Sequence, residues 1–344
     1  MASYCGNMHA MIIAILTLVT YNVYMLGARE ISTSDLHEKA MKARHEMWMV
    51  EHGRTYKDEI QKAQRFKVFK TNANFIDKSN AVGNGKYVLA TNKFADMSNE
   101  EFMAMYARSK PMAHGSKEPL GFKYLNVTLS DLPEEVDWVK KGAVTKVKDQ
   151  KDCECCWAFA TVAIVEGIHQ IKTGELLTLS EQHLVDCSDR DNGCQGGNMV
   201  KALKYIIKND GIATEKDYPY TGRRGWCQHV EPAVKITGYR NVPYDNEDEL
   251  AAAVAKQPVA VGIDSGKFQF YHDGVMLGHG CGTDTNHGMA VVGYGTTQDG
   301  IKYWLLKNNW GEDWGEGGYL RLERGINACG VAKMPTYAVA QTRK

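Results

Sequence analysis

The cysteines of this 344-residue chain are concentrated in its C-terminal part, and this distribution constrains the fold more than any other feature. Eight of the nine cysteines lie between Cys153 and Cys329, and none lies between Cys5 and Cys153. Such concentrated cysteines indicate disulfide bonds and an oxidising compartment. Cys153 and Cys156 have a Cys-x-x-Cys spacing, but no second pair or suitably spaced histidine accompanies them, so we expect no metal site and no cofactor.

The charge balance excludes some classes of function. Basic and acidic side chains both number 41, so the formal net charge is zero and indicates neither a nucleic-acid surface nor a basic membrane patch. Residues 1–131 carry 17 basic and 13 acidic side chains, whereas residues 132–344 carry 24 and 28. The two parts are therefore able to attract each other, although a chance imbalance explains the numbers equally well.

An apolar run near the start predicts entry into the secretory pathway. Residues 10–21 are too few to span a bilayer comfortably, and they stand where a signal peptide has its apolar core. Small residues follow at Gly27 and Ala28, so we expect cleavage after residue 28; the alternative is a membrane anchor. The expected destination is a vacuole, a lysosome or the extracellular space, with no membrane association after cleavage.

Residues 34–80 have the pattern of two helices. Ser34 is able to cap a first helix through Glu51, with Gly53 as its stop, and a second helix is expected over residues 58–80. Residues spaced by three or four positions share one face of that second helix: Arg65, Phe69, Asn72, Ile76 and Asn80. Asparagine is unusual on a packing face and indicates hydrogen bonds made across it.

Residues 108–131 are rich in proline and glycine and predict an exposed linker. This linker contains the sequon Asn126-Val127-Thr128, so we expect Asn126 to be glycosylated in a secreted chain.

From Leu132 onward the pattern changes from helical to mixed. A helix is expected over residues 156–172, with Gly174 as its stop. Beyond residue 230, strand-like segments dominate, and we expect strands over 259–263, 289–294, 302–307, 319–322 and 337–340. A helical first half followed by a strand-rich second half predicts an α+β fold with two lobes and a cleft between them.

The segment from Gln150 to Phe159 carries the strongest chemical signal. It places Cys156 at the start of the expected helix, where unpaired backbone N–H groups favour a thiolate, the nucleophile of acyl transfer. Among the eleven histidines, His287 stands at the mouth of an expected buried strand and is a candidate base. Asn308 follows another expected strand and is able to accept the imidazole N–H and orient the ring.

These motifs together resemble the papain-like cysteine proteases, in plant-type form. In that family the histidine and asparagine follow the cysteine by about 130–150 residues, and His287 and Asn308 follow Cys156 at such separations. The stripe from Arg65 to Asn80 and the residues Asn92, Phe94 and Asp96 resemble the family's inhibitory propeptide. The resemblance implies a helical propeptide over residues 29–131 and, over 132–344, a catalytic domain with a helical lobe and a β-barrel-like lobe.

The resemblance also implies a role for individual residues. Gln150 would complete the oxyanion hole, Trp310 would shield the hydrogen bond between His287 and Asn308, and Gly196 and Gly197 would present backbone to the substrate. The residues matching the main specificity pocket are apolar or small and favour an apolar side chain at P2: Met199, Val261, Gly288 and Met334. The implied disulfides are Cys153–Cys194, Cys187–Cys227 and Cys281–Cys329.

The implied partners follow from the same resemblance. We expect peptide or protein substrates, the chain's own propeptide as an intramolecular inhibitor, cystatin-like inhibitors, and a monomer.

Two residues beside the nucleophile depart from the family pattern. Glu154 stands where glycine is expected, and its carboxylate would disfavour a thiolate at Cys156. Cys155 is left without an expected partner, so it is either a free thiol or a thiol that exchanges with the adjacent disulfide or is oxidised. An active cysteine endopeptidase is the expected function; a weak or inactive homologue acting as a binding or storage protein is the alternative.

Overall fold

A computed structural model describes residues 33–83, 85–107, 121–124 and 127–340. The expected signal peptide, the sequon asparagine Asn126 and most of the expected linker lie outside these residues. The chain divides into two compact units, residues 1–59 and 60–344. Among the described residues, none of the helices combines the length and the apolar character that crossing a bilayer requires.

The first unit contains helix α2 (Thr33–Glu51), which agrees with the expected first helix. At its C-terminal end, His45 stacks on Trp48 and on Tyr56, and the Arg54 guanidinium lies over the Trp48 ring. These contacts hold the turn that follows α2 against the helix.

The second unit opens with the propeptide-like elements α3 (Glu59–Val82), β1 (Tyr87–Leu89) and α4 (Asn99–Tyr106). The polar members of the predicted stripe make the expected hydrogen bonds to the loop after β1. Asn72 donates to two backbone carbonyls, of Ala95 and Met97, at 2.8 Å each, and Arg65 pairs with Glu101 at 2.7 Å. Helix α4, which the sequence analysis missed, begins with a capping box between Ser98 and Glu101.

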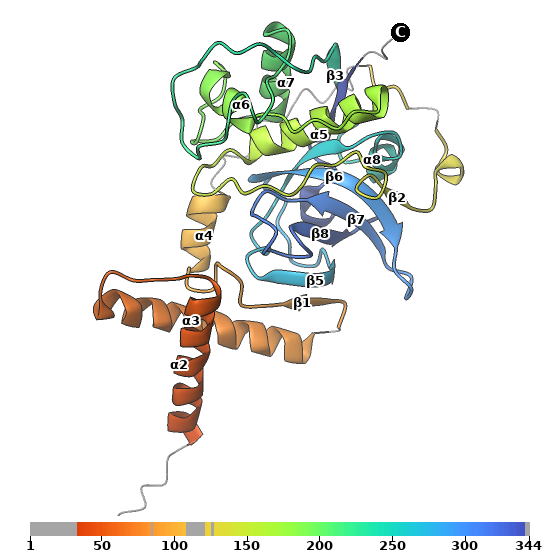
Figure 1. Cartoon of the computed structure of the whole chain (residues 1–344). Helices are drawn as coiled ribbons and strands as arrows, with labels where there is room; N and C mark the ends of the chain where they lie inside the picture. The colour runs from red at the N-terminus through yellow and green to blue at the C-terminus, as the bar shows by residue number, and fades with distance from the viewer. Residues whose placement is uncertain (1–32, 84, 108–120, 125–126, 341–344) are drawn as a thin grey trace, which may run out of the picture. The chain divides into compact units, whose positions relative to one another are not determined.

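The helical lobe is built around α5 (Cys156–Thr173). Gly174 ends this helix in a left-handed conformation, as predicted. Helices α6 (Glu181–Cys187) and α7 (Met199–Lys208) pack beside it (Figure 1). The face that α5 turns toward the other lobe packs on β6, β4 and β9.

The second lobe is a sheet flanked by α8 (Glu247–Val254). Its strands are β2 (Val136–Asp137), β3 (Gly238–Asn241), β4 (Val259–Ile263), β5 (Tyr271–Met276), β6 (His287–Thr296), β7 (Lys302–Lys307), β8 (Tyr319–Glu323) and β9 (Thr336–Val339). Short 3₁₀ turns stand at Leu129–Asp131 and Ala328–Gly330. The five expected strands are confirmed within two residues at each end, whereas β3 and β5 were missed.

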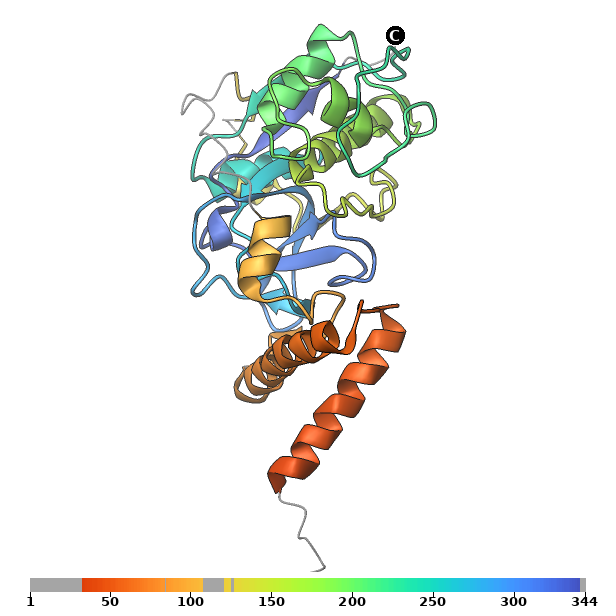
Figure 2. The same cartoon turned by 90° about the vertical axis from the view of Figure 1, so that its left-hand side faces the viewer.

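The sheet is open, which corrects the expectation of a barrel-like lobe. Among the described residues its strand order is β1-β5-β8-β7-β6-β4-β9-β3, with β2 added to β6, and the two ends do not pair. The edge is extended by β1, which pairs antiparallel with β5 through Tyr87 and Gly274. The propeptide-like segment thus adds a strand to the sheet of the second lobe (Figure 1). Figure 2 shows helix α4, in orange-yellow, beside the blue strands of that lobe.

Three disulfides tie the loops of the two lobes. They join Cys153 to Cys194, Cys187 to Cys227 and Cys281 to Cys329, the pairs that the resemblance implied. Since the first two lie in the helical lobe and the third in the sheet lobe, each lobe is cross-linked within itself.

Candidate active site

The candidate nucleophile stands where α5 begins. Cys156 is the first residue of the helix and is buried, with Cys155 as the N-cap. A helix N-terminus stabilises a thiolate over a thiol. Strand β6 passes directly beside this point, because a Cβ added to Gly288 would come within 3.1 Å of the Cys156 carbonyl oxygen. Cys156 and the start of β6 therefore lie next to each other, although they belong to opposite lobes.

The candidate base is the first residue of β6. His287 Nε2 lies 2.8 Å from Asn308 Oδ1, just beyond the end of β7. The same oxygen accepts the Asn309 backbone N–H at 2.9 Å, and Asn309 Nδ2 donates to the Gly288 carbonyl at 3.0 Å. The ring of Trp310 covers the pair, with its centroid 4.6 Å from that of His287. The asparagine and tryptophan thus hold the imidazole in one orientation.

The protonation of His287 follows from this geometry. Because Asn308 Oδ1 is an acceptor, Nε2 carries the ring proton in the neutral form and Nδ1 is the basic nitrogen. Nδ1 is buried and has no hydrogen-bond partner among the described residues. Burial lowers the pKa of His287 to about 4, against the opposing effect of the hydrogen bond that the ring donates to Asn308. The precursor therefore holds a neutral imidazole whose free nitrogen is able to take a proton.

Gln150 is held by its backbone and leaves its side chain unused. Its N–H donates to the Asn309 carbonyl at 2.9 Å, and its carbonyl accepts from the Tyr220 hydroxyl at 2.6 Å. Both polar atoms of its buried amide have no partner among the described residues. An unpaired buried amide costs about 1–3 kcal/mol. The Gln150 side chain is therefore available to form hydrogen bonds with a bound ligand.

Two of the expected substrate-binding glycines could not be replaced without collision or strain. A Cβ on Gly197 would lie 2.5 Å from the Trp157 ring, and Gly196 has a φ of +94°. The Cys153–Cys194 disulfide and a backbone bridge from Glu154 to Gln195 hold this loop beside the nucleophile.

The expected pocket residues are divided between the two cores. Met199 and Met334 belong to the apolar cluster of the helical lobe, whereas Val261 packs in the core of the sheet lobe. Val261 lies one residue before Gly262, which pairs with Gly288. The four positions therefore come from both lobes, and Gly288 is the one whose backbone lies against Cys156.

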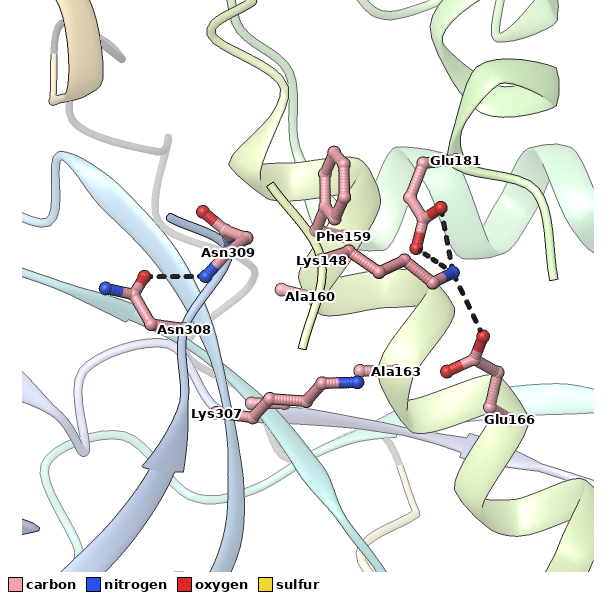
Figure 3. Close-up of a pocket in the computed structure, with 10 residues that line it drawn as sticks. Lys148, Phe159, Ala160, Ala163, Glu166, Glu181, Lys307, Asn308 and Asn309 are labelled. Atoms are coloured by element: carbon pink, nitrogen blue, oxygen red, sulfur yellow. Dashed lines mark hydrogen bonds and ion pairs between the residues drawn. The ribbon is translucent and has the colours of Figure 1, made fainter. Parts of the chain in front are cut away.

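A charged cluster lies between the lobes behind the asparagine (Figure 3). Lys148 Nζ contacts Glu181 Oε1 at 2.7 Å and Glu166 Oε1 at 3.3 Å, and both carboxylates are buried. Lys307 Nζ donates to Thr145 Oγ1 at 2.9 Å, and that hydroxyl donates to Glu166 at 2.7 Å. Because Lys307 directly precedes Asn308, this cluster supports the backbone that presents the asparagine.

Burial shifts the titration of this cluster. Burial raises the pKa of Glu181 to about 7 and lowers that of Lys307. Burial alone would also lower the pKa of Lys148, but the Glu181 and Glu166 carboxylates outweigh it and raise that pKa. The charge of Lys148 is therefore firmly retained between its two carboxylates.

Cys155 is a buried free thiol. Its Sγ lies 3.1 Å from the Tyr220 hydroxyl, and burial raises its pKa well above the ordinary value. Since the thiolate is the reactive form, this environment favours the inert free thiol over the exchanging one. Tyr220, which no sequence signal pointed to, thus contacts both Cys155 and the backbone of Gln150.

The propeptide-like segment packs on the tryptophan that covers His287. The rings of Phe94, Phe102 and Tyr106 lie edge-on to Trp310, at centroid distances of 5.9, 5.2 and 6.1 Å. Trp314 lies 5.0 Å from Trp310 on the catalytic side. The aromatic cluster joins the loop after β1 and helix α4 to the active-site loop.

A two-lobed fold with a thiol at a helix start, and an asparagine-bound histidine on the strand that passes this point from the other lobe, is the arrangement of a cysteine protease, here with an inhibitor-like segment still attached. The family model "Papain family cysteine protease" matches residues 132–339, and the model "Cathepsin propeptide inhibitor domain (I29)" matches residues 45–102. The chain belongs to the papain family and is the precursor of a cysteine endopeptidase.

Similar proteins and structures are consistent with this assignment. The chain is 48% identical to a "Senescence-specific cysteine protease SAG39" of Oryza sativa subsp. japonica, over 96% of this chain and 98% of that protein. It is 46% identical to "Vignain" of Vigna mungo, over 89% of each. The proform of the ragweed pollen allergen Amb a 11 superposes with a TM-score of 0.83 at 42% identity, over 89% of this chain and 96% of that one. A recombinant stem bromelain precursor gives 0.82 at 42%, over 88% and 99%.

The sequence analysis missed the charged cluster behind the site, although a signal for it existed. Glu166 interrupts the otherwise apolar run of residues 157–168 in α5, and a carboxylate at such a position needs a buried cation. Its partner Lys148 lies 18 residues earlier, in a loop, and no local pattern connects the two.

Proposed function

We propose that Cys156 is the nucleophile of peptide-bond hydrolysis and that His287 is its base and proton donor. Nδ1 first takes up the thiol proton to give a thiolate–imidazolium pair, and the thiolate then attacks the carbonyl carbon of the scissile bond. His287 then gives that proton to the leaving amine as the C–N bond breaks. A thioester between Cys156 and the acyl half of the substrate remains, and water activated by His287 hydrolyses it.

The oxyanion formed at each tetrahedral step requires donors. In this proposal the side-chain amide of Gln150 and the backbone N–H of Cys156 supply them, and one such donor lowers the barrier by about 3 kcal/mol. Asn308 keeps the imidazole aligned throughout, and Trp310 excludes water from their hydrogen bond.

The observation that carries the proposal is the imidazole of His287, with one nitrogen bonded to Asn308 and the other buried without a partner among the described residues. Burial in the precursor opposes a charged imidazolium, so the thiolate–imidazolium pair is expected to form once the propeptide has left and water reaches the site.

We further propose three segments: a signal peptide over 1–28, an inhibitory propeptide over 29–131 and the catalytic domain over 132–344. The propeptide blocks the cleft until mild acid weakens its docking, after which the enzyme acts as a monomer in a vacuole, a lysosome or the extracellular space. Cystatin-like proteins would inhibit it, Asn126 would be glycosylated, and substrates with an apolar P2 side chain would be preferred.

The nucleophile is tested by replacing each of two adjacent buried cysteines. Cys156→Ala is expected to abolish hydrolysis of a fluorogenic peptide and labelling by an epoxide directed at active-site cysteines. The matched variant Cys155→Ala should keep most of the activity. If Cys156→Ala stays active and Cys155→Ala does not, the nucleophile is misassigned; if the activated wild type neither cleaves peptide nor is labelled, the chain is an inactive homologue.

A further inference from the structure

One lysine of the propeptide-like segment is held by two carboxylates of the catalytic domain. Lys93 Nζ lies 2.8 Å from Asp149 Oδ2 and 3.3 Å from Asp313 Oδ1. The lysine side chain is 19% exposed, whereas the two aspartates are 35% and 49% exposed. The cation is thus more buried than the carboxylates that receive it.

Both carboxylates lie close to the backbone of Gly311. A Cβ added to Gly311 would lie 2.8 Å from Asp313 Oδ1, 3.2 Å from Lys93 Nζ and 3.3 Å from Asp149 Oδ2. Asp149 also forms a backbone bridge with Trp310, and the Gly311 N–H donates to the Lys148 carbonyl at 3.1 Å. The carboxylates therefore converge on a rigid surface where only glycine leaves room for a cation.

This surface adjoins the machinery of the proposed function. Asp149 directly precedes Gln150, and Gly311 directly follows Trp310, whose ring lies tilted over that of His287. His287 gives its proton to the leaving amine, so the leaving half of a substrate passes His287 and Trp310. The acyl half lies toward Gly196 and Gly197, in the other lobe.

We propose that Asp149 and Asp313 form a cation subsite on the leaving-group side of the cleft and select substrates with a lysine or arginine there. The inference rests on the proposed function. In the precursor, the ammonium group of Lys93 fills the subsite. When the propeptide leaves, the two carboxylates that contacted this ammonium group face each other without a cation between them. A basic substrate side chain relieves their repulsion and restores the same pair of contacts.

The presence of Lys93 separates this subsite from an ordinary acidic surface patch. An exposed pair of aspartates alone indicates a solvated surface. Here the catalytic domain already binds an amine at that point, with a hydrogen bond of 2.8 Å to Asp149, and the amine comes from a segment that occupies the domain only before activation.

The test uses activated enzyme and internally quenched peptides that differ at one position. Lysine, norleucine or glutamate is placed in turn at each of the first three positions after the scissile bond, and mass spectrometry verifies the cleavage point. At one of these three positions, kcat/KM should be about three- to tenfold higher for the lysine peptide than for the norleucine peptide. At that same position, kcat/KM should be lowest for the glutamate peptide. The preference should shrink in 0.5 M NaCl, because the carboxylates are partly exposed.

The variant Asp149→Asn/Asp313→Asn should reduce the ratio of lysine to norleucine to near one. Asp299→Asn is the matched control: Asp299 also pairs with a lysine of the propeptide-like segment, Lys86, and its loss should leave the ratio unchanged. Equal cleavage of all three peptides by the wild type would overturn the subsite and leave the proposed function standing. A preference that survives in the double variant would equally overturn it, whereas failure to cleave any peptide would contradict the proposed function itself.

Discussion

The segment from Lys307 to Trp310 takes part in two interfaces of opposite chemistry. At one end, Lys307 belongs to the buried charged cluster between the lobes, with Glu166 and Lys148. At the other end, Trp310 packs against Phe102 and two further aromatic rings of the propeptide-like segment. The first interface lies inside the catalytic domain, and the second joins that domain to a segment it is proposed to lose.

The segment from Lys307 to Trp310 thus makes one contact that is permanent, with the charged cluster, and one that is temporary, with the propeptide-like segment. A buried charge that loses its partner is strongly destabilising, so a charged interface resists separation. Aromatic rings need no single partner, and on separation Trp310 would keep its contacts with His287 and Trp314. At Trp310, losing the propeptide therefore removes aromatic packing without leaving a buried charge unpaired.

The largest effect is expected from breaking the permanent interface. Glu166→Ala would leave Lys148 with one carboxylate fewer and remove the acceptor of the Leu179 N–H. We expect the free energy of unfolding to fall by about 3–5 kcal/mol, measured by urea denaturation of the Cys156→Ala precursor. The control Asp189→Ala removes a carboxylate from the exposed pair with Lys208 and should change stability by less than about 1 kcal/mol. Equal effects of the two substitutions would refute the contrast.

The temporary interface should be weakened by Phe102→Ala. Its fully buried ring contacts Trp310, and we expect a loss of about 3 kcal/mol of docking free energy. The precursor should then mature faster and at a higher pH, which gel analysis of the purified precursor over time measures. Val82→Ala, at a side chain that is 77% exposed at the end of α3, is the control and should mature at the wild-type rate. A Phe102→Ala precursor that matures no faster would show that the aromatic cluster does not hold the propeptide.

Acid should act in opposite directions on the two regions. The low pKa of buried His287 contributes stability that is present above about pH 6.5 and is lost as the pH falls toward 4. The raised pKa of Glu181 contributes stability that is present at acidic pH and is lost as the pH rises through 7. Acidification thus disfavours the closed catalytic site while sparing the cluster between the lobes.

The test compares urea unfolding at pH 7 and pH 5 in the Cys156→Ala precursor. Replacing His287 by Asn should remove about 2 kcal/mol of the stability lost on acidification. The exposed His279→Asn is the control and should leave the loss unchanged. An unaltered pH dependence in the His287 variant would mean that this imidazole is already solvated in the precursor.

The smallest effect concerns Glu154, on the loop beside the nucleophile. Because a nearby carboxylate disfavours a thiolate, Glu154→Gln should speed alkylation of Cys156 by iodoacetamide about two- to threefold at mildly acidic pH. Asp152→Asn, two residues earlier and exposed, is the matched control. Identical rates in wild type and Glu154→Gln would show that the Glu154 charge is neutralised by its surroundings.

The sequence predicted those parts of the fold in which local pattern and burial agree. Helix α5 and strand β7 were predicted within one residue of their bounds, because apolar periodicity and a terminal glycine or charged residue mark them. Strand β5, with the sequence YHDGVM, was missed because exposed His272 and Asp273, followed by Gly274, interrupt the apolar pattern. Its place in the sheet comes from parallel pairing with β8, a long-range contact that no local pattern encodes.

The same division holds for the site. Motif spacing was enough to single out Cys156, His287 and Asn308, since each lies at the end of a regular element. The contacts of Tyr220 and Lys93 were not predictable, because each reaches the site across at least 50 residues from an irregular segment. The barrel-like lobe that the resemblance implied is an open sheet among the described residues, because its edge strands β1 and β3 do not pair with each other.

The proposed nucleophile and base belong to different lobes, with Cys156 at the start of α5 and His287 at the start of β6. Their separation is therefore set by the seam along which α5 lies on the sheet. A shear of about 1 Å along such a seam is enough to cost about a hundredfold in rate, long before either lobe unfolds. On heating or under pressure, the rate of hydrolysis should thus decline before spectroscopy detects unfolding. The rate of hydrolysis therefore reports on the packing between the helical lobe and the sheet lobe more sensitively than spectroscopy does.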